Sequence, residues 1–243
     1  MTLPTHAMVL AAGRGTRMKA LSRHLPKPLM VVAGRTLLDR TLDRIAAVGI
    51  GTAVVNTHYL GEAVEAHLAT RHGAPEIVLS PETELLETGG GVAAALPLLG
   101  AEPFLVHNSD VILPDGPTPS LVRLGRSWDD GTMDALLLVH RTPHAVGYTG
   151  FGDYFVDAWG RMRRRRGQEV APYLFTGVQM LHPRLFEGCP EGPFSLNVLY
   201  DRAQTTGRLW AVVHDGMWIH VGTPEGLQRA NRLLTSPYLF EER

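Results

Sequence analysis

The chain has 243 residues, 44% of them hydrophobic and 19% charged, with a formal net charge of −1. This length is enough to bury a core, and we expect one domain over residues 1–243. The balanced charge excludes the general attraction that draws basic proteins to nucleic acids or anionic membranes. The single cysteine, Cys189, cannot form an internal disulfide, which suits a reducing compartment such as the cytoplasm. We expect no signal peptide, because residues 1–6 carry no basic region followed by an apolar core, and no membrane span, because no apolar run approaches about 18 residues.

Strands and helices alternate in the first half of the chain. Residues 7–12 form a short apolar run that ends at Gly13, which is typical of a buried parallel strand. Residues 36–48 carry apolar side chains at the helical period, and Gly49 is a suitable end for that helix. The same reasoning predicts strands at 52–56, 76–79, 104–108 and 135–139, and helices at 60–69 and 91–99, the last with Thr88 as a candidate N-cap. These repeated units predict an α/β fold with a doubly wound, mostly parallel, Rossmann-like sheet.

The pattern changes after about residue 150. Short strand candidates separated by turn residues follow, at 155–156, 161–162, 174–175, 209–213 and 218–219. They predict a small antiparallel extension, a lobe of the same domain that closes over one end of the sheet. Thr223 and Pro224 then mark the start of a last helix that runs to residue 234, because proline suits the first helical position after a threonine cap.

A glycine-rich loop follows the first predicted strand, and in it Gly13 and Gly15 are interspersed with Arg14, Thr16 and Arg17. Open α/β sheets bind ligands at the carboxyl ends of their strands. Glycines there let backbone N–H groups approach an anion, and arginine supplies paired donors for phosphate. An NAD(P)-dependent oxidoreductase is the first alternative. The missing third glycine, and the missing acidic residue after the second predicted strand, argue against it.

Lys27 stands between Pro26 and Pro28, and the only other lysine is Lys19. Two prolines stiffen a segment and hold an ammonium group in place, although a lone Pro-Lys-Pro is also common in surface loops. Together with Leu-Ala-Ala-Gly-Arg-Gly-Thr-Arg-Met at residues 10–18, this segment resembles the nucleotidyltransferases that activate sugar 1-phosphates, which have a GT-A type fold.

The resemblance implies that the first loop wraps the phosphates and base of an NTP, and that the lobe after residue 150 covers the sugar. The nucleotide-binding residues of this loop are expected to be Leu10, Ala11, Ala12, Gly13, Arg14, Gly15 and Thr16. Arg17 and Lys27 would contact the phosphates, and we expect both to be catalytic.

Asp110 follows the strand predicted at 104–108, where an acidic residue points into the ligand crevice. A carboxylate is a ligand that Mg²⁺ prefers, although an aspartate after a strand is often only part of a turn. The resemblance implies a metal-binding, catalytic Asp110, with Ser109 in the family's glycine position. It also aligns His220 with the family's second metal ligand, usually an aspartate. Imidazole suits Mn²⁺, Zn²⁺ or Co²⁺ better than Mg²⁺, so His220 serves a metal, hydrogen-bonds a phosphate or is a structural histidine of the core.

Residues 80–92 contain three consecutive glycines, a poor start for a helix unless a flat group lies against the backbone. The resemblance implies that this loop reads the nucleobase, through Glu82, Glu87, Thr88 and Gly89. A carboxylate at Glu82 can accept from N3–H of uracil, or from N1–H and N2–H₂ of guanine. The run most resembles the N-acetylmuramic acid 1-phosphate uridylyltransferases of cell-wall recycling, and stretches at 152–154, 175–183 and 185–189 support the same match.

By the same analogy, Asn108, Gly152 and Thr176 would face the sugar. Many family members grip the sugar phosphate with a second lysine; here the arginines at 163–166 are candidates, unless that run is only a charged edge strand. The expected reaction joins UTP and N-acetylmuramic acid 1-phosphate, with Mg²⁺ or Mn²⁺, to give a nucleotide sugar and pyrophosphate. The alternatives are a mannose-1-phosphate guanylyltransferase that uses GTP and a non-catalytic homologue that binds nucleotide sugars. The oligomeric state stays open.

Overall fold

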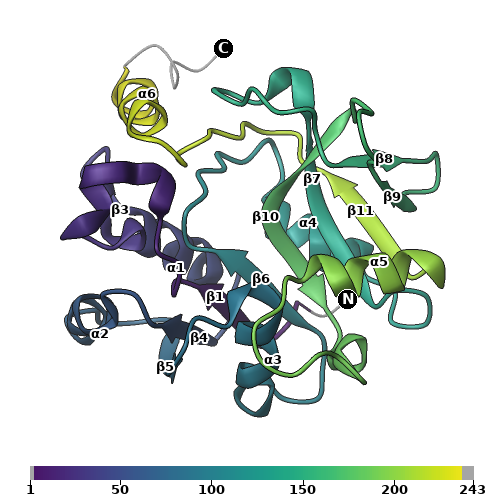
Figure 1. Cartoon of the computed structure of the whole chain (residues 1–243), viewed down its shortest axis with the longest axis horizontal. Helices are drawn as coiled ribbons and strands as arrows, with labels where there is room; N and C mark the ends of the chain where they lie inside the picture. Colours follow the sequence, from purple (N-terminus) through teal and green to yellow (C-terminus); the bar gives the residue numbers. More distant parts are fainter. Residues whose placement is uncertain (1–2, 237–243) are drawn as a thin grey trace.

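One mixed sheet organises the molecule, and helices cover both of its faces (Figure 1). The computed structural model describes residues 3–236, with the side chains at 19 and 20 excepted. The strands that run through the sheet are β1 (His6–Leu10), β4 (Thr52–Thr57), β5 (Glu76–Pro81), β6 (Phe104–Asn108), β7 (Ala135–Arg141), β10 (Tyr173–Leu181) and β11 (Leu209–Val213). Their order across the sheet is β11-β7-β10-β6-β1-β4-β5.

Along this order of seven strands, four of the six pairings are parallel, in agreement with the predicted mostly parallel sheet, although β11 was expected in the antiparallel extension. β1 pairs in parallel with β4 and β6, β4 with β5, and β7 with β11. β10 is the exception, because it runs antiparallel to both of its neighbours, β6 and β7. Parallel strands end at the same edge, so the loops after β1, β4 and β6 meet there.

The position of β10 differs from the prediction of a short strand at 174–175 in a peripheral extension. The strand has nine residues and lies in the middle of the sheet. Its polar residues hid this from the sequence, since Thr176 and Gln179 interrupt the apolar run yet both are buried. Inside the core, the Oε1 of Gln179 accepts a hydrogen bond from the Tyr200 hydroxyl.

The antiparallel part is small and lies beside β10. β8 (Tyr154–Val156) and β9 (Met162–Arg164) form a hairpin, and β8 joins β10 through the pair Tyr154–Tyr173. A second two-stranded sheet, β2 (Val31–Val32) with β3 (Arg35–Thr36), follows the glycine-rich loop. Short 3₁₀ helices are η1 (Thr16–Arg23), η2 (Lys27–Leu29), η3 (Thr142–His144) and η4 (Pro183–Phe186).

The core is divided into layers by the sheet. On one face, α1 (Leu37–Ala47), α2 (Gly61–Ala69) and α4 (Ser120–Ser127) pack against the strands. On the other face lie α3 (Glu87–Leu99) and α5 (Asn197–Thr205). A smaller cluster joins η1, β2 and α6 (Pro224–Thr235), and it includes Met18, Val32, Ile219 and Ala230. α6 therefore packs on the N-terminal segment rather than on the main sheet.

The helix predictions hold for α1, α2 and α6, but α3 differs. It begins at Glu87 rather than 91, so its first turn includes all three consecutive glycines, and the residue at its N-cap is Leu86 rather than Thr88. The sequence reading also missed α4 and α5, which are only eight and nine residues long. Within residues 3–236, no helix combines the length and apolar character needed to cross a membrane.

Candidate active site

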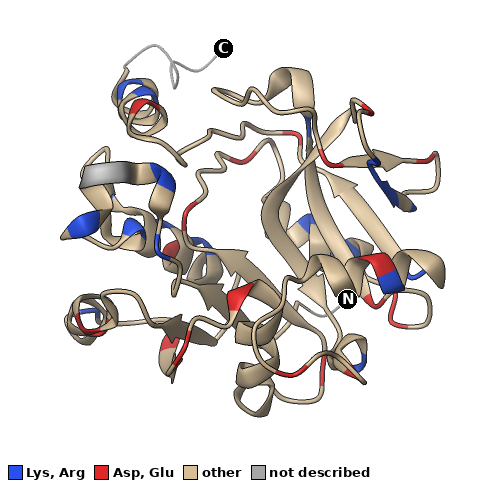
Figure 2. Ribbon diagram, in the orientation of Figure 1, with Lys and Arg blue, Asp and Glu red and all other residues tan. Residues whose placement is uncertain are grey.

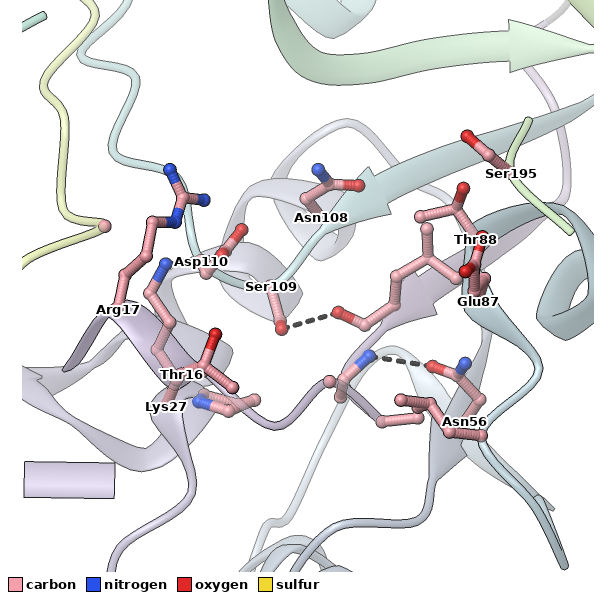
Figure 3. A pocket seen from close by; sticks show the side chains of 18 residues that line it. Thr16, Arg17, Lys27, Asn56, Glu87, Thr88, Asn108, Ser109, Asp110 and Ser195 are labelled. Carbon is pink, nitrogen blue, oxygen red and sulfur yellow. Dashed lines mark hydrogen bonds and ion pairs between the residues drawn. The ribbon is translucent and has the colours of Figure 1, made fainter. Parts of the chain in front are cut away.

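A cavity of about 430 Å³ opens at the carboxyl ends of β1 and β6 (Figure 3). Its walls come from the glycine-rich loop, η2, the start of α3 and the segment after β6. The residues that line it are Leu10, Ala11, Ala12, Gly13, Gly15, Thr16, Arg17, Lys27, Pro28, Asn56, Leu85, Glu87, Thr88, Asn108, Ser109, Asp110, Ser195 and Gly222. Segments far apart in the chain thus contribute to one hollow, at the edge where an open α/β sheet binds ligands.

Glycine suits positions 13 and 15 of the loop for different structural reasons. Gly15 has φ +58°, and a Cβ there would lie 3.2 Å from Cβ of Lys27, so both the backbone conformation and the close approach favour glycine. Gly13 has open space around it and lines the cavity. The close approach at Gly15 brings the loop against η2. The open space at Gly13 leaves the backbone accessible to a bound anion.

Lys27 and Asp110 form an ion pair with 2.5 Å between Nζ and Oδ2. Lys27 is only 7% exposed, and it stands at the start of η2 with a proline on each side. The Asp110 carboxylate is more open, with 34% of its side chain accessible. Figure 3 shows that Arg17 approaches the same place from η1. Two cations and a carboxylate therefore share one wall of the cavity, where a polyanion and a cation can both find partners.

Ser109, which the resemblance aligned with a glycine, fits without strain. Its backbone φ is not in the left-handed region, its hydroxyl donates to the carbonyl of Leu10 at 2.6 Å, and its N–H points to the same carbonyl. The serine ties the end of β6 to the end of β1, which places Asp110 beside the glycine-rich loop (Figure 3).

His220 lies at the edge of this group. Its ring stacks on Trp218 with centroids 5.9 Å apart and folds over Gly222, where an added Cβ would overlap the imidazole. Burial lowers the pKa of His220, and the positive charges of Arg17 and Lys27 lower it further against the opposing effects of Asp110 and of a hydrogen bond with the Gly147 backbone, so the net shift favours the neutral imidazole.

The donor set fits a cation that takes few protein ligands. Among the described residues no group of three or more His, Cys, Asp and Glu side chains could hold a metal. Mg²⁺ commonly binds through one or two carboxylates, with waters and substrate phosphates completing its shell. Asp110 on the cavity wall, with neutral His220 nearby, suits that mode and does not suit a closed structural site.

Glu82 does not line the cavity, although we expected it to read the base. It is 8% exposed, and both of its carboxylate oxygens accept hydrogen bonds inside the protein, from Asn56 Nδ2 at 2.6 Å and from the Leu86 N–H at 3.0 Å. Glu87 and Thr88, from the same loop, do line the cavity. Glu87 has φ +59°, a conformation that is uncommon outside glycine and that often marks a functional site.

The first two of the three glycines at the start of α3 serve close packing against the segment 192–196. Gly89 and Gly90 both donate to the carbonyl of Phe194, and a Cβ at Gly89 would overlap the Phe194 ring. Leu196 N–H donates to the Thr88 hydroxyl in the same contact. The segment 192–196 therefore lies across the first turn of α3 and brings Ser195 to the cavity. Gly89 itself is buried and does not line the cavity.

Of the three residues expected to face the sugar, only Asn108 lines the cavity. Thr176 is buried on β10, where its hydroxyl donates to the Leu138 carbonyl and its own carbonyl accepts from Trp218 Nε1. Gly152 has φ +71°, and a Cβ there would overlap the Ala171 carbonyl oxygen, so it serves a tight loop contact. Arg14 also lies outside the lining, unlike its neighbours in the glycine-rich loop.

The arginines at 163–166 lie away from the cavity. Figure 2 shows the basic stretch of β9 at the far end of the sheet from β4 and β5. Arg163 pairs with Glu169, Arg164 with Asp201, and Arg165 donates to the carbonyls of Gly152 and Gly167. The reading as a charged edge strand fits these contacts, whereas the reading as a phosphate grip finds no support in them.

Sequence reasoning missed several residues that line the cavity, notably Asn56, Leu85 and Ser195. Asn56 had a usable signal, since it ends the second predicted strand at the edge of the sheet where ligands bind. Ser195 had none, because the contact between segment 192–196 and α3 joins parts of the chain about 100 residues apart.

Comparison with known proteins gives a consistent result. The MobA-like NTP transferase domain matches residues 7–179 of the chain. The N-acetylmuramate alpha-1-phosphate uridylyltransferase of Caulobacter vibrioides is 42% identical over 226 residues, which cover 91% of this chain and 93% of that protein. The protein of the same name in Neisseria meningitidis is 36% identical over 233 residues, 93% of this chain and 97% of the relative.

More distant relatives and solved structures are also similar to most of this chain. A mannose-1-phosphate guanylyltransferase catalytic subunit beta of Drosophila pseudoobscura pseudoobscura is 30% identical over 91% of this chain, which spans 60% of that protein. A UDP-glucose pyrophosphorylase bound to UDP-glucose superposes with a TM-score of 0.76 at 16% identity, covering 94% of this chain and 97% of its own. HddC from Yersinia pseudotuberculosis, in complex with GMP-PN, has a TM-score of 0.76 at 22% identity over 93% of this chain and 98% of its own.

Proposed function

This chain belongs to the MobA-like NTP transferase family, and on that basis we propose that it transfers the uridylyl group of UTP to N-acetylmuramic acid 1-phosphate. The two relatives that match over more than 90% of both lengths carry this activity in their names. The observation that carries the proposal is the convergence of Arg17, Lys27 and Asp110 on one cavity beside the glycine-rich loop. The products are a UDP-sugar and pyrophosphate.

The reaction needs positioning and charge neutralisation more than covalent help. An oxygen of the sugar phosphate attacks the α-phosphorus of the NTP, and the bond from that phosphorus to the bridging oxygen of the β-phosphate breaks. No general base is needed, because a phosphate monoester is already ionised near neutral pH. Backbone N–H groups around Gly13, with Arg17 and Lys27, would stabilise the negative charge on the α-phosphate and on departing pyrophosphate.

Asp110 would hold Mg²⁺ or Mn²⁺, with neutral His220 as a second ligand or as a partner for a metal-bound water. The ion, when bound, would neutralise phosphate charge at the reacting centre. Asp110 contacts Lys27 at 2.5 Å, so the carboxylate also keeps the Lys27 ammonium at the cavity wall. Thr88, Glu87 and Ser195 border the remaining part of the cavity and would contact the nucleoside or the sugar.

A guanylyltransferase that acts on mannose 1-phosphate is the second candidate, since the Drosophila relative matches nearly all of this chain. The test is pyrophosphate release with purified protein and Mg²⁺, using UTP, GTP, CTP and ATP in combination with N-acetylmuramic acid 1-phosphate, N-acetylglucosamine 1-phosphate and mannose 1-phosphate. We expect the highest kcat/KM with UTP and N-acetylmuramic acid 1-phosphate. A preference for GTP and mannose 1-phosphate selects the second candidate, and no release with any pair leaves the non-catalytic homologue.

A further inference from the structure

Asn56 and Glu82 form a buried bridge between the two loops that would hold the nucleotide. Asn56 lies near the end of β4, and Glu82 directly follows β5, so the parallel pairing of these strands brings the two side chains to the same edge. Asn56 is 2% exposed and Glu82 is 8% exposed. A carboxylate this buried is costly unless its oxygens accept hydrogen bonds. Both oxygens of the Glu82 carboxylate therefore require a hydrogen-bond donor.

The polarity of each hydrogen bond is fixed by the backbone at both ends. The Ala11 N–H can only donate, so the Asn56 atom 2.7 Å away must be Oδ1. The amide Nδ2 then donates to Glu82 Oε1 at 2.6 Å. The Leu86 N–H, also only a donor, reaches Glu82 Oε2 at 3.0 Å. A continuous relay thus runs from Ala11 in the glycine-rich loop to Leu86 at the start of α3.

Both ends of the relay border the cavity. Ala11 and Asn56 line it directly, and Leu86 lies between two residues that line it, Leu85 and Glu87. Gly91 packs over the middle of the relay, where a Cβ would lie 2.7 Å from Glu82 Oε1 and 2.9 Å from Asn56 Nδ2. The relay therefore connects the glycine-rich loop to the loop that carries Glu87 and Thr88.

We propose that Asn56 and Glu82 are positioning residues that set the spacing between the triphosphate and nucleoside parts of the site. The inference rests on the proposed function, because it takes an NTP as the ligand of this cavity. Glu82 acts through Leu86 rather than by contact with the base. A displacement of either loop by about 1 Å is expected to weaken productive NTP binding by on the order of 10- to 100-fold.

The fixed polarity provides the test. In Asn56→Asp, a new carboxylate oxygen faces Glu82 Oε1, so two acceptors meet. In Glu82→Gln, the new amide NH₂ faces either the Asn56 amide or the Leu86 N–H, so two donors meet at that contact. In the double variant N56D/E82Q, the new carboxylate accepts from the Ala11 N–H and from the new amide, and the oxygen of that amide accepts from the Leu86 N–H. Every bond of the relay is then restored with the central donor reversed.

The measurement is binding of UTP with MgCl₂ by calorimetry, together with KM for UTP and for the sugar 1-phosphate. We expect each single variant to weaken UTP binding and raise KM for UTP by about tenfold or more, with KM for the sugar 1-phosphate within about threefold of wild type. The double variant should return within about threefold of wild type. If the two residues had only a structural role, the single variants would lower the yield of folded protein. KM for UTP would then not rise selectively, and the double variant would not restore UTP binding.

Gly91→Ala is a second route if a single variant does not fold. Its methyl group pushes the bridge apart without changing a donor or acceptor, whereas the matched control Gly51→Ala meets nothing within 4 Å. We expect Gly91→Ala to weaken UTP binding and Gly51→Ala to leave it unchanged. Wild-type affinity for UTP in the single variants or in Gly91→Ala would overturn this inference but not the proposed function. A double variant that binds UTP no better than the single variants would have the same consequence. A wild-type protein that binds no NTP overturns the proposed function as well.

Discussion

At the scale of single residues, the site depends on groups that are held by their own neighbours before any ligand arrives. The Lys27 ammonium is buried and paired with Asp110 at 2.5 Å. Ser109 and Asn56 bond to the backbone of Leu10 and Ala11 and so hold the end of β1. Preorganised charges of this kind need little rearrangement during a reaction, which is why they stabilise a transition state effectively.

Asp110→Asn should reduce turnover by about 10²–10³ while the protein stays folded, because the amide keeps the size of the side chain but removes the charge. The measurement is kcat for pyrophosphate release, with the circular dichroism spectrum as the check on folding. Asp201→Asn is the matched control, since Asp201 is an exposed carboxylate of α5 paired with Arg164. Near-wild-type kcat in a folded Asp110→Asn protein would contradict the assignment of Asp110 to metal and phosphate chemistry.

At the scale of elements, the contact between α3 and the segment 192–196 builds one side of the cavity. The carbonyl of Phe194 accepts from two N–H groups in the first turn of α3, where backbone donors have no partner within the helix. Glycine is needed there because the two chain segments touch. A packing requirement between distant segments thus explains a sequence feature that resembles a ligand-binding loop.

Gly89→Ala should destabilise the protein by about 1–3 kcal/mol, because its methyl group would overlap the Phe194 ring and overpacking displaces the segment. The displacement should also raise KM for at least one substrate, since Ser195 and Thr88 border the cavity. Urea denaturation and steady-state kinetics measure the two effects. Gly51→Ala, which meets no atom within 4 Å, is the control, and equal stability of the two variants would contradict the packing explanation.

At the scale of the whole molecule, several buried histidines make stability depend on pH. His107 is fully buried on β6, and desolvation lowers its pKa to about 3, with Arg44 adding to the effect. The folded protein therefore keeps His107 neutral, whereas the unfolded chain takes up a proton below its usual pKa of about 6.5. Stability is complete above that pKa and falls as the pH drops from about 6.5 towards 3.

His107→Gln removes this contribution, so the difference between wild type and variant isolates it from His140 and His214, whose pKa values burial also lowers. Between about pH 7 and pH 5, wild type should lose about 2 kcal/mol more of its unfolding free energy than the variant loses. Denaturant titrations at the two pH values measure this. Equal losses in the two proteins would show that His107 does not stay neutral in the folded state.

The sequence by itself determined the alternating strands and helices and the mostly parallel sheet, because apolar periodicity and turn residues are local signals. The resemblance of its motifs to a known family predicted that the glycine-rich loop, Lys27 and Asp110 belong to one site, and the structure brings them to one cavity. The MobA-like match over residues 7–179 and the superposable solved structures agree with the predicted family and fold.

Only the tertiary structure decided the rest. The central place of β10, the role of the glycines of α3 and the inward turn of Glu82 towards Asn56 all depend on contacts between distant segments. A buried carboxylate and a ligand-facing carboxylate look alike in a sequence, and the partners that distinguish them come from elsewhere in the fold. The physical reason is that burial and hydrogen-bond satisfaction are properties of the packed molecule, whereas periodicity belongs to the chain.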